Sequence, residues 1–502
     1  MTILDYLWSD IASNLTGYLL RQPWFLGRTR ALQEVRMADV AWLRSPPAGL
    51  ALVFLHCAFG DGAAEFYLMP LGLVLGERPL RVPPEAVIMP RTSTMAGSAV
   101  VYDAMADDVA CHFLLEMMKL KTPLPTSLGQ IIVQPSPALQ AIRGKSNEPL
   151  VIHRSGQRTN RFVQYNQGGQ GRIMLKLFSR LEPGVNPDYE IAQFLSDKTH
   201  FACMPPLAGA ISYQCFGVET TVAILHGYEP HEGTARDVAE QELEKLIATA
   251  RAAGPAATPE ALQAAAHQNT SWAALLGQRT AELHQAMMSD PQAPAFRPEP
   301  MTVEDIGLIV ANIHRRARRV EELWRTEQAQ RALRTQLGQL YAADDLGQKI
   351  RCHGDFDLEQ VLSRRNDFVI IDFEGEPERT LAERQRKQSP LKDVAGMIRS
   401  FDVVATRFLA RVTGGDQDAL TPWVRAWQDA VTGAFLGSYV DQLGSTHLLP
   451  ADPQTYEALL WLMTLEKTLL DLGRAWESHP EWIDRACDAV KSLLGAASDT
   501  AP

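Results

Sequence analysis

The chain has 502 residues, a formal net charge of −11 and a hydrophobic fraction of 46%. This length exceeds what one hydrophobic core usually organises, so we expect two or three packed units. The acidic balance argues against broad nucleic-acid binding, and no apolar run approaches the roughly 20 residues of a membrane span. We therefore expect a cytoplasmic enzyme with no nucleic-acid or membrane partner.

The N-terminal part is predicted to combine helices with a small sheet. The opening stretch MTILDYLWSD is acidic and aromatic, which is unlike a secretory signal, and a helix is expected to begin near Tyr6. Apolar runs at 50–59 and 63–73 flank the turn Gly60-Asp61-Gly62, and Asp-Gly between apolar runs is typical of a hairpin. Residues 104–118 show helical periodicity.

Strands continue to about residue 228 and helices follow. Polar or glycine-rich turns separate several strand-like runs, and a helix is expected from Pro187. The predicted strands are 150–154, 161–165, 172–178 and 216–228. The 3.6-residue period then recurs in the predicted helices 237–253, 272–288, 303–327 and the last sixty residues. Six scattered cysteines form no C-x-x-C pair, so we expect reduced, buried thiols.

Residues 351–377 interrupt the helices with a short hairpin crowded by acids. These are Asp355, Asp357, Glu359, Asp372, Glu374 and Glu376. A polar turn at 364–367 predicts that residues 359–360 lie opposite 371–372, which brings Gln360 and Asp372 together. Amide and carboxylate oxygens suit Mg²⁺, and Asp355 can then stand nearby as a base. The alternative is that these acids are only solvated loop residues, and His353 is expected to be a structural hydrogen bonder.

A single lysine, Lys176, interrupts the apolar strand RIMLKLF. A buried ammonium group without a partner is costly, so a carboxylate or an anionic ligand is expected beside it. Glu190, on the helix that follows, is the candidate partner. The alternative is an edge strand on which Lys176 points to solvent.

The order of these features is that of the protein-kinase-like phosphotransferases: a strand lysine, a helix acid, a loop aspartate, then an amide and an aspartate on a hairpin. The glycine-rich loop G-x-G-x-x-G is missing. Its place is taken by the turn 155–160, where backbone N–H groups around Ser155, Gln157 and Thr159 can form a phosphate site. An ordinary surface turn is the alternative there.

The sequence resembles the maltokinases, which are ATP-dependent sugar kinases with an aminoglycoside-phosphotransferase-like fold. The resemblance is densest in HGDFDLEQVL, VIIDFEGEP and LAERQRKQSPLKDVAGMIRSFD. It extends to WFLGR, FYLMPL, VYDAM, LKLFSRLEPGVNPDYEI, LGQRTAELH, AFRPEP and LEKTLLDL. It therefore covers nearly the whole chain.

This resemblance implies an α+β, protein-kinase-like bilobal fold. The expected parts are an N-terminal cap subdomain over 1–105, an intermediate lobe over 106–230 and a helical C-lobe over 231–502.

The resemblance also implies residue roles. Asp355 is the expected base, Gln360 and Asp372 the Mg²⁺ ligands and Glu374 an outer contact. Lys176, paired with Glu190, is expected to steady the ATP phosphates, and the strand end at 223–228 to border the adenine.

The chain departs from the family pattern in the sugar-binding parts. Asp357 stands where the family has histidine, and the C-terminal helix reads EKTLLDLGRAWE. In that helix Glu466 and Lys467 match the family's glutamate and lysine, and Asp471 is a shorter substitute for the family's next glutamate. The family's tyrosine, arginine, tyrosine and glutamate are replaced by Leu470, Gly473, Arg474 and Ala475. Candidate sugar contacts are therefore Asp357, Lys467, Asp471 and Arg474.

The leading hypothesis is a maltokinase that converts ATP and maltose to ADP and maltose 1-phosphate. It would supply α-glucan and trehalose metabolism and associate with trehalose synthase. The altered helix leaves a kinase for another sugar or amino sugar as an alternative. A non-catalytic, kinase-like partner of a trehalose-converting enzyme is a second alternative.

Overall fold

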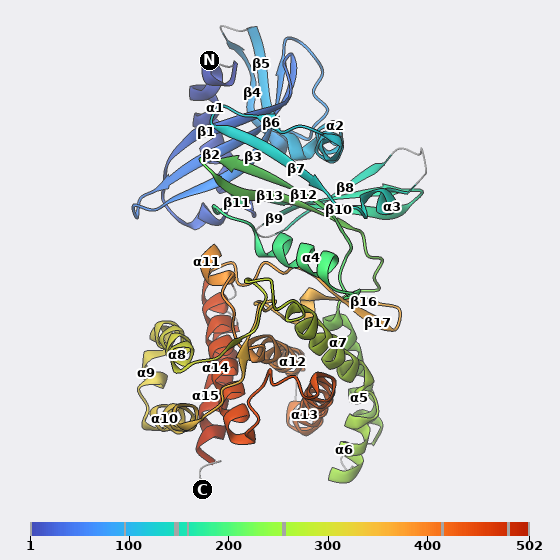
Figure 1. The fold of residues 1–502 in the computed structure, drawn as a ribbon, viewed down its shortest axis with the longest axis vertical. Helices are drawn as coiled ribbons and strands as arrows, with labels where there is room; N and C mark the ends of the chain where they lie inside the picture. The colour runs from blue at the N-terminus through green and yellow to red at the C-terminus, as the bar shows by residue number, and fades with distance from the viewer. Residues whose placement is uncertain are drawn as a thin grey trace. The chain divides into compact units, whose positions relative to one another are not determined.

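The computed structural model describes residues 3–94, 97–144, 150–157, 160–253, 258–412, 416–478 and 482–499. The chain divides into two compact units, drawn in Figure 1. The first comprises Met1–Gln193 with Pro205–Pro230, and the second Phe194–Met204 with His231–Pro502. Strands dominate the first unit and helices the second, which confirms the predicted α+β class. The finer division into cap, intermediate and helical subdomains stays a prediction.

The first sheet of the first unit is antiparallel, in the order β1-β2-β3-β5-β4, with β11 pairing β3. Its elements are β1 (Leu32–Arg44), β2 (Ala48–Phe59), β3 (Ala64–Leu75), β4 (Val87–Thr94), β5 (Gly97–Asp103) and β11 (Arg180–Leu181), preceded by helix α1 (Ile3–Leu20). The predicted hairpin is confirmed: Ala58 pairs with Ala64 across a turn in which Gly62 has φ 82°. Such a φ value favours glycine.

The second sheet follows the order β6-β7-β12-β13-β10-β9-β8. Its strands are β6 (Leu124–Pro125), β7 (Gly129–Pro135), β8 (Val151–Gln157), β9 (Asn160–Gln167), β10 (Gln170–Phe178), β12 (Leu207–Cys215) and β13 (Val218–Gly227). The accompanying helices are α2 (Asp108–Glu116), α3 (Leu139–Arg143) and α4 (Pro187–Lys198). Sequence patterns predicted β8, β9, β10 and β13 but missed β6, β7 and β12; of their pairings, only that of β7 with β12 joins distant parts of the chain.

One hydrophobic core joins the two sheets, because Leu52, Phe54 and Leu68 of the first sheet pack with Ile131 and Val163 of the second. A buried carboxylate adds polar links. Asp39 on β1 accepts hydrogen bonds from the Thr126 hydroxyl (2.5 Å) and the Tyr213 hydroxyl (2.6 Å). It therefore ties the first sheet to β12 and to the β6–β7 turn.

A second buried carboxylate, Asp103 at the end of β5, has a similar role. It accepts from the Tyr18 hydroxyl at 2.8 Å and pairs with the Arg161 guanidinium at 3.0 Å. Arg161 lies on β9, donates to the Leu68 carbonyl at 3.0 Å and stacks over the Trp24 ring. These contacts compensate for part of the hydrogen bonding that a buried guanidinium loses to water.

The described part of the second unit is built on helices. They are α5 (Ala235–Ala253), α6 (Pro259–His267), α7 (Ser271–Met287), α8 (Val303–Ala317), α9 (Glu321–Trp324), α10 (Glu327–Ala342), α11 (Leu381–Arg384), α12 (Leu391–Arg411), α13 (Asp416–Leu443), α14 (Pro453–Ser478) and α15 (Ile483–Asp499). The predicted helix 303–327 is thus divided: Val320, with φ −128°, ends the helical path and α9 begins at the next residue. Trp324 of α9 folds back and donates to His314 of α8 at 3.2 Å.

Two short strand pairs interrupt these helices. Strand β14 (Glu299–Pro300) pairs with β15 (Gln348–Lys349), and β16 (Val361–Arg364) pairs with β17 (Asp367–Ile370). The β16–β17 hairpin lies against α5 and α7 (Figure 1).

The six cysteines are free, as predicted, and four of them are buried. No helix within the described ranges has both the length and the apolar character needed to cross a membrane.

Candidate functional site

The loop before the hairpin is held by helix α12. Both oxygens of Asp393 accept backbone hydrogen bonds, from the His353 N–H (2.8 Å) and from the Gly354 N–H (2.9 Å). At Gly396 a Cβ atom would lie 2.3 Å from the Phe356 carbonyl oxygen, so only glycine lets α12 approach this closely. The loop that carries Asp355 is therefore fixed at its backbone.

His353 connects this loop to the hairpin. Its Nε2 donates to the Ile371 carbonyl at 2.8 Å, and its ring centroid lies 5.1 Å from those of both Phe356 and Phe373. The prediction that His353 is a structural hydrogen bonder is confirmed.

The hairpin has the predicted register. Arg364 pairs with Asp367 and Val361 with Ile370, and beyond the ladder the Ile371 N–H donates to the Gln360 carbonyl at 3.0 Å. Gln360 and Asp372 thus lie at the open end.

Two further contacts brace the hairpin. Arg279 of α7 binds both carboxylate oxygens of Asp367, at 2.7 and 3.1 Å. The Ser363 N–H donates to the Gly233 carbonyl at 2.9 Å, which adds a third backbone segment to the edge of the hairpin.

The open end of the hairpin offers oxygen ligands. Asp372 has φ 69°, a left-handed conformation in which Asp and Asn are more frequent than most residues, and the chain turns there toward Glu374. The amide oxygen of Gln360 and the half-buried carboxylates of Asp372 and Glu374 are the hard donors that Mg²⁺ prefers. This donor chemistry fits the predicted metal; the ligand roles themselves stay predictions.

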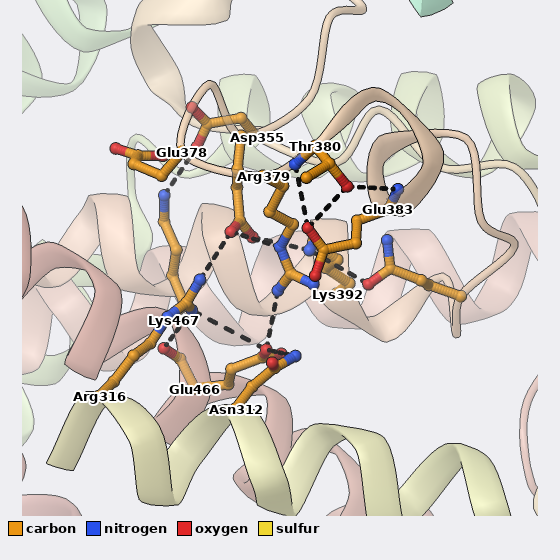
Figure 2. A network of polar contacts seen from close by, with 12 residues as sticks. Asn312, Arg316, Asp355, Glu378, Arg379, Thr380, Glu383, Lys392, Glu466 and Lys467 are labelled. Atoms are coloured by element: carbon orange, nitrogen blue, oxygen red, sulfur yellow. Dashed lines mark hydrogen bonds and ion pairs between the residues drawn. The ribbon is translucent and has the colours of Figure 1, made fainter. Parts of the chain in front are cut away.

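Asp355 follows the fixed loop and is held between two cations of α14. Its Oδ1 lies 3.0 Å from the Lys467 Nζ, and the Arg474 guanidinium donates to Oδ1 at 3.2 Å and to Oδ2 at 2.9 Å. Arg474 also donates to Glu378 at 2.8 Å. Asp355, Glu378 and Lys467 are labelled in Figure 2. Two residues predicted as sugar contacts, Lys467 and Arg474, therefore meet the predicted base.

This environment keeps Asp355 ionised. Burial by itself would raise the pKa of the carboxyl, because only 15% of the side chain is exposed, but the charges of Lys467 and Arg474 outweigh burial and lower that pKa. Burial by itself would lower the pKa values of Lys467 and Arg474. The charge of Asp355 opposes burial, and both pKa values are raised.

Asp357 caps the short 3₁₀ helix Leu358–Gln360. Its Oδ1 accepts from the backbone N–H groups of Glu359 (2.8 Å) and Gln360 (3.2 Å). Burial, with the charges of Asp355 and Glu359, raises the pKa of Asp357 to about 6 against the opposing charge of Lys467. The side chain thus orients the segment that carries Gln360, a role that sequence reasoning missed; its predicted sugar contact stays a prediction.

Asp471 is one helical turn after Lys467, with its carboxylate 3.5 Å from the lysine Nζ. It also pairs with Arg399 of α12 at 3.2 Å. Burial lowers the pKa of Arg399. Sequence reasoning missed Arg399, because its position becomes relevant only when α12 packs against α14.

A buried ionic network lies around Glu376 and Glu466. Its members Arg316, Arg379, Lys392 and Glu466 are labelled in Figure 2. Glu376 pairs with Arg316 at 2.8 Å and with Arg379 and Lys392 at 2.7 Å each. Arg379 also binds Glu466 at 2.8 Å. Burial would raise the pKa of Glu376, but the three cations hold it well below its usual range. Glu376 therefore anchors the segment after the hairpin to α8 and α12.

In the first unit, Lys176 is on an interior strand. It pairs with Phe162 of β9 and Ile224 of β13, and only 4% of the residue is exposed, so the edge-strand alternative is wrong. Its Nζ lies 2.7 Å from Asp188, in the first turn of α4. Sequence reasoning missed Asp188, although acids are common in a first helical turn. The pairing with Glu190 stays a prediction.

The polar stretch expected to form a turn at 155–160 is largely strand: β8 continues to Gln157, which pairs with Asn160 at the start of β9. Thr159 and the side chains of Ser155 and Gln157 lie outside the described residues. Their predicted contacts with ATP stay predictions.

Comparisons with known proteins support the sugar-kinase resemblance. Residues 18–107 match the family model of the maltokinase N-terminal cap domain. A glucosamine kinase from Streptacidiphilus jiangxiensis is 29% identical over 134 residues, which is 27% of this chain and 29% of the relative. A glucosamine kinase from Mycolicibacterium smegmatis (strain ATCC 700084 / mc(2)155) is 29% identical over 150 residues, 30% of this chain and 35% of the relative. The chain thus aligns with about a third of the length of these curated relatives.

Solved structures resemble the chain over almost its whole length. Crystal form B of a glucosamine kinase superposes with a TM-score of 0.64 at 19% identity and covers 97% of this chain and 99% of that chain. A glucosamine kinase in complex with glucosamine, ADP and inorganic phosphate gives a TM-score of 0.62 at 19% identity and covers 95% of this chain and 98% of that chain.

The fold is kinase-like, and residues 18–107 match a cap domain. The chain resembles maltokinases in its cap and glucosamine kinase in its fold. The predicted resemblance to maltokinase-like sugar kinases is therefore confirmed.

Proposed function

We propose that the protein is an ATP-dependent sugar kinase, which transfers the γ-phosphoryl group of ATP to a hydroxyl group of a small sugar. The observation that carries this proposal is the frame formed by the loop and the hairpin. Asp393 fixes the loop before Asp355, and the hairpin register leaves Gln360 and Asp372 at the open end of the hairpin. Phosphoryl transfer depends on this kind of positioning more than on covalent chemistry.

Each group then has a role. Asp355 orients the acceptor hydroxyl and takes its proton as the new oxygen–phosphorus bond forms. Gln360 and Asp372 hold Mg²⁺, with Glu374 as an outer contact, and the ion neutralises charge on the phosphates when it is bound. Lys176, oriented by Asp188 at 2.7 Å, steadies the ATP phosphates.

The low pKa of Asp355 fits this assignment. A weak base suits a loose transition state, in which the hydroxyl proton is transferred late. Orientation of the acceptor hydroxyl by Asp355 is then its main contribution.

The charges around Asp355 favour a neutral sugar acceptor. Asp355 is paired with Lys467 and Arg474, Glu378 with Arg474, and Asp471 with Lys467 and Arg399. An ammonium group entering this site would have to displace one of these internal cations, whereas a neutral hydroxylated sugar would not. Maltose is the first acceptor to test; its product, maltose 1-phosphate, would supply α-glucan and trehalose metabolism.

An amino-sugar acceptor is the second candidate. The aligned relatives are glucosamine kinases, and the Arg474 guanidinium lies within 3.2 Å of both Asp355 and Glu378. Two carboxylates thus stabilise one cation at this point, and the ammonium of an amino sugar is a cation that would replace it.

A single assay separates these proposals. The purified protein is incubated with Mg²⁺, ATP and, in turn, maltose, glucose and glucosamine, and the phosphorylated sugar is identified by ³¹P NMR. We expect maltose 1-phosphate. Preference for glucosamine would move the assignment to the amino-sugar kinases. Binding of Mg²⁺–ATP without transfer to any sugar would favour a non-catalytic partner, and the first complex to seek would be with trehalose synthase.

A further inference from the structure

A buried histidine outside the proposed site contacts the residue that holds the Asp355 loop. His284 is on α7, and its side chain is 0% exposed. Its Nε2 lies 3.1 Å from Asp393 Oδ2, and its Nδ1 lies 2.9 Å from the Tyr439 hydroxyl of α13. The imidazole therefore connects α7 and α13 to the carboxylate of α12.

The direction of the hydrogen bonds follows from the acceptor. Burial would raise the pKa of Asp393, but the hydrogen bond from His284, the nearby imidazoles and the Gly354 N–H lower it. An ionised carboxylate only accepts, so His284 Nε2 is the donor. Asp393 then receives three donors: His284 and the backbone N–H groups of residues 353 and 354.

The hydrogen bond from Gly354 to Asp393 fixes the residue that directly precedes the proposed base, Asp355. Gly354 has φ 87°, and glycine has access to many other conformations. The bond from its N–H to Asp393 selects this one, and the direction of the next side chain, Asp355, follows from it. A carboxylate that lost its bond to His284 would be held by the two backbone N–H groups alone, and the Gly354 bond would weaken as the carboxylate shifted.

We propose that His284 is a positioning residue for phosphoryl transfer, which orients Asp393 so that the Gly354 backbone presents Asp355 to the acceptor hydroxyl. This inference rests on the proposed sugar-kinase function. His284 touches neither the phosphates nor the sugar in this scheme, so its effect is on the rate of transfer rather than on nucleotide binding.

The kinetic test compares three variants. His284→Leu removes the donor, His284→Gln retains an amide N–H for Asp393, and Thr280→Val is the matched control. Thr280 is one turn earlier on α7, equally buried, and donates only within the helix, to the Leu276 carbonyl at 2.8 Å. Misplacement of a reacting group by about 1 Å costs about 100-fold in rate. We expect a kcat loss of that order in His284→Leu, an unchanged KM for ATP, substantial rescue in His284→Gln and wild-type kinetics in Thr280→Val.

A second measurement needs no substrate. Hydrogen–deuterium exchange in peptides that cover residues 350–358 is followed in the full chain without nucleotide. We expect faster exchange at the amides of His353 and Gly354 in His284→Leu, and wild-type exchange in His284→Gln and Thr280→Val. If His284→Leu does not fold, His284→Asn, whose side chain is too short to reach Asp393, takes its place.

The two readouts fail in different ways. If the wild-type protein phosphorylates no sugar, the proposed function is wrong, while the exchange experiment still decides whether His284 holds the loop. Unchanged exchange in His284→Leu would overturn the inference. So would an equal loss of kcat in Thr280→Val, because it would show a general packing effect of α7.

Discussion

At the scale of single residues, the acids crowded into residues 351–377 divide into different roles. Asp355 binds two cations of α14, Asp357 caps a 3₁₀ helix, and Glu376 is enclosed by three cations. Glu359 pairs with Arg236. The acids look alike in the sequence, but only some of them are arranged for the proposed chemistry.

Replacement of Asp355 tests the proposed base. Asp355→Asn keeps the shape and removes the charge, so we expect kcat to fall about 10²- to 10⁴-fold, the usual range for loss of a general base. Affinity for ATP should change little, because the role is directed at the acceptor. Steady-state kinetics and calorimetric titration with ATP measure the two quantities, and wild-type turnover would refute the role.

Replacement of Arg474 tests the charge balance around Asp355. Arg474 lowers the pKa of Asp355, so Arg474→Leu should raise that pKa toward or above its ordinary value. Because the ionised carboxylate is the active form, activity should then be lost at a higher pH as the solution is acidified. The pH profile of kcat/KM shows this as an upward shift of the acid limb. Arg474→Lys, which keeps the charge, should shift it less; an unmoved limb in Arg474→Leu would contradict the assignment.

At the scale of elements, the β16–β17 hairpin depends on its neighbours. Arg279 of α7 holds Asp367 at the closed end, and His353 holds Ile371 at the open end. A two-stranded hairpin is at best marginally stable alone in water, so these contacts are needed to keep Gln360 and Asp372 in place at its open end.

Replacement of Asp372 tests the proposed metal ligand, and a suitable change leaves the backbone conformation at this residue, with φ 69°, undisturbed. Asp372→Asn is the suitable change because Asn also tolerates a positive φ. We expect it to remove the Mg²⁺ dependence of ATP binding, since a neutral amide is a weaker ligand than a carboxylate. Titrations with ATP in the presence of Mg²⁺ and of EDTA measure this. Glu383→Gln, which alters an acid that caps α11, is the control and should leave the Mg²⁺ dependence intact.

At the scale of the whole molecule, buried carboxylates connect elements that are far apart in sequence. Asp39 joins β1 to the β6–β7 turn and to β12, and Asp103 joins α1 to β9. The first unit therefore depends on polar contacts between its sheets as well as on its shared apolar core.

Removal of Asp39 should destabilise the first unit. Asp39→Ala leaves the hydroxyls of Thr126 and Tyr213 without their acceptor, and hydrogen bonds to a charged group contribute ~1.5–3 kcal/mol each, though not additively. We expect the free energy of unfolding to fall by about 3 kcal/mol, measured by urea denaturation. Asp39→Asn, which keeps one acceptor oxygen, should lose less; an unchanged free energy of unfolding in Asp39→Ala would contradict the role of this carboxylate.

Much of the fold and of the candidate site follows from local sequence patterns. The hairpin around 364–367, the 50–73 hairpin, the start of α4 at Pro187 and the position of Gln360 and Asp372 at the open end of their hairpin depend on neighbouring residues along the chain. Turn chemistry and hydrophobic period act over such short distances. They were therefore readable without the tertiary structure.

The partners of the charged groups were decided by tertiary packing. Asp188 meets Lys176, two cations of α14 enclose Asp355, and Arg399 of α12 reaches Asp471. The sequence by itself determined which residues are present and which turns and helices form. Only the packing of helices and sheets decided which charges lie within about 3 Å of each other, because ion pairs between distant segments leave no periodic signal in the chain.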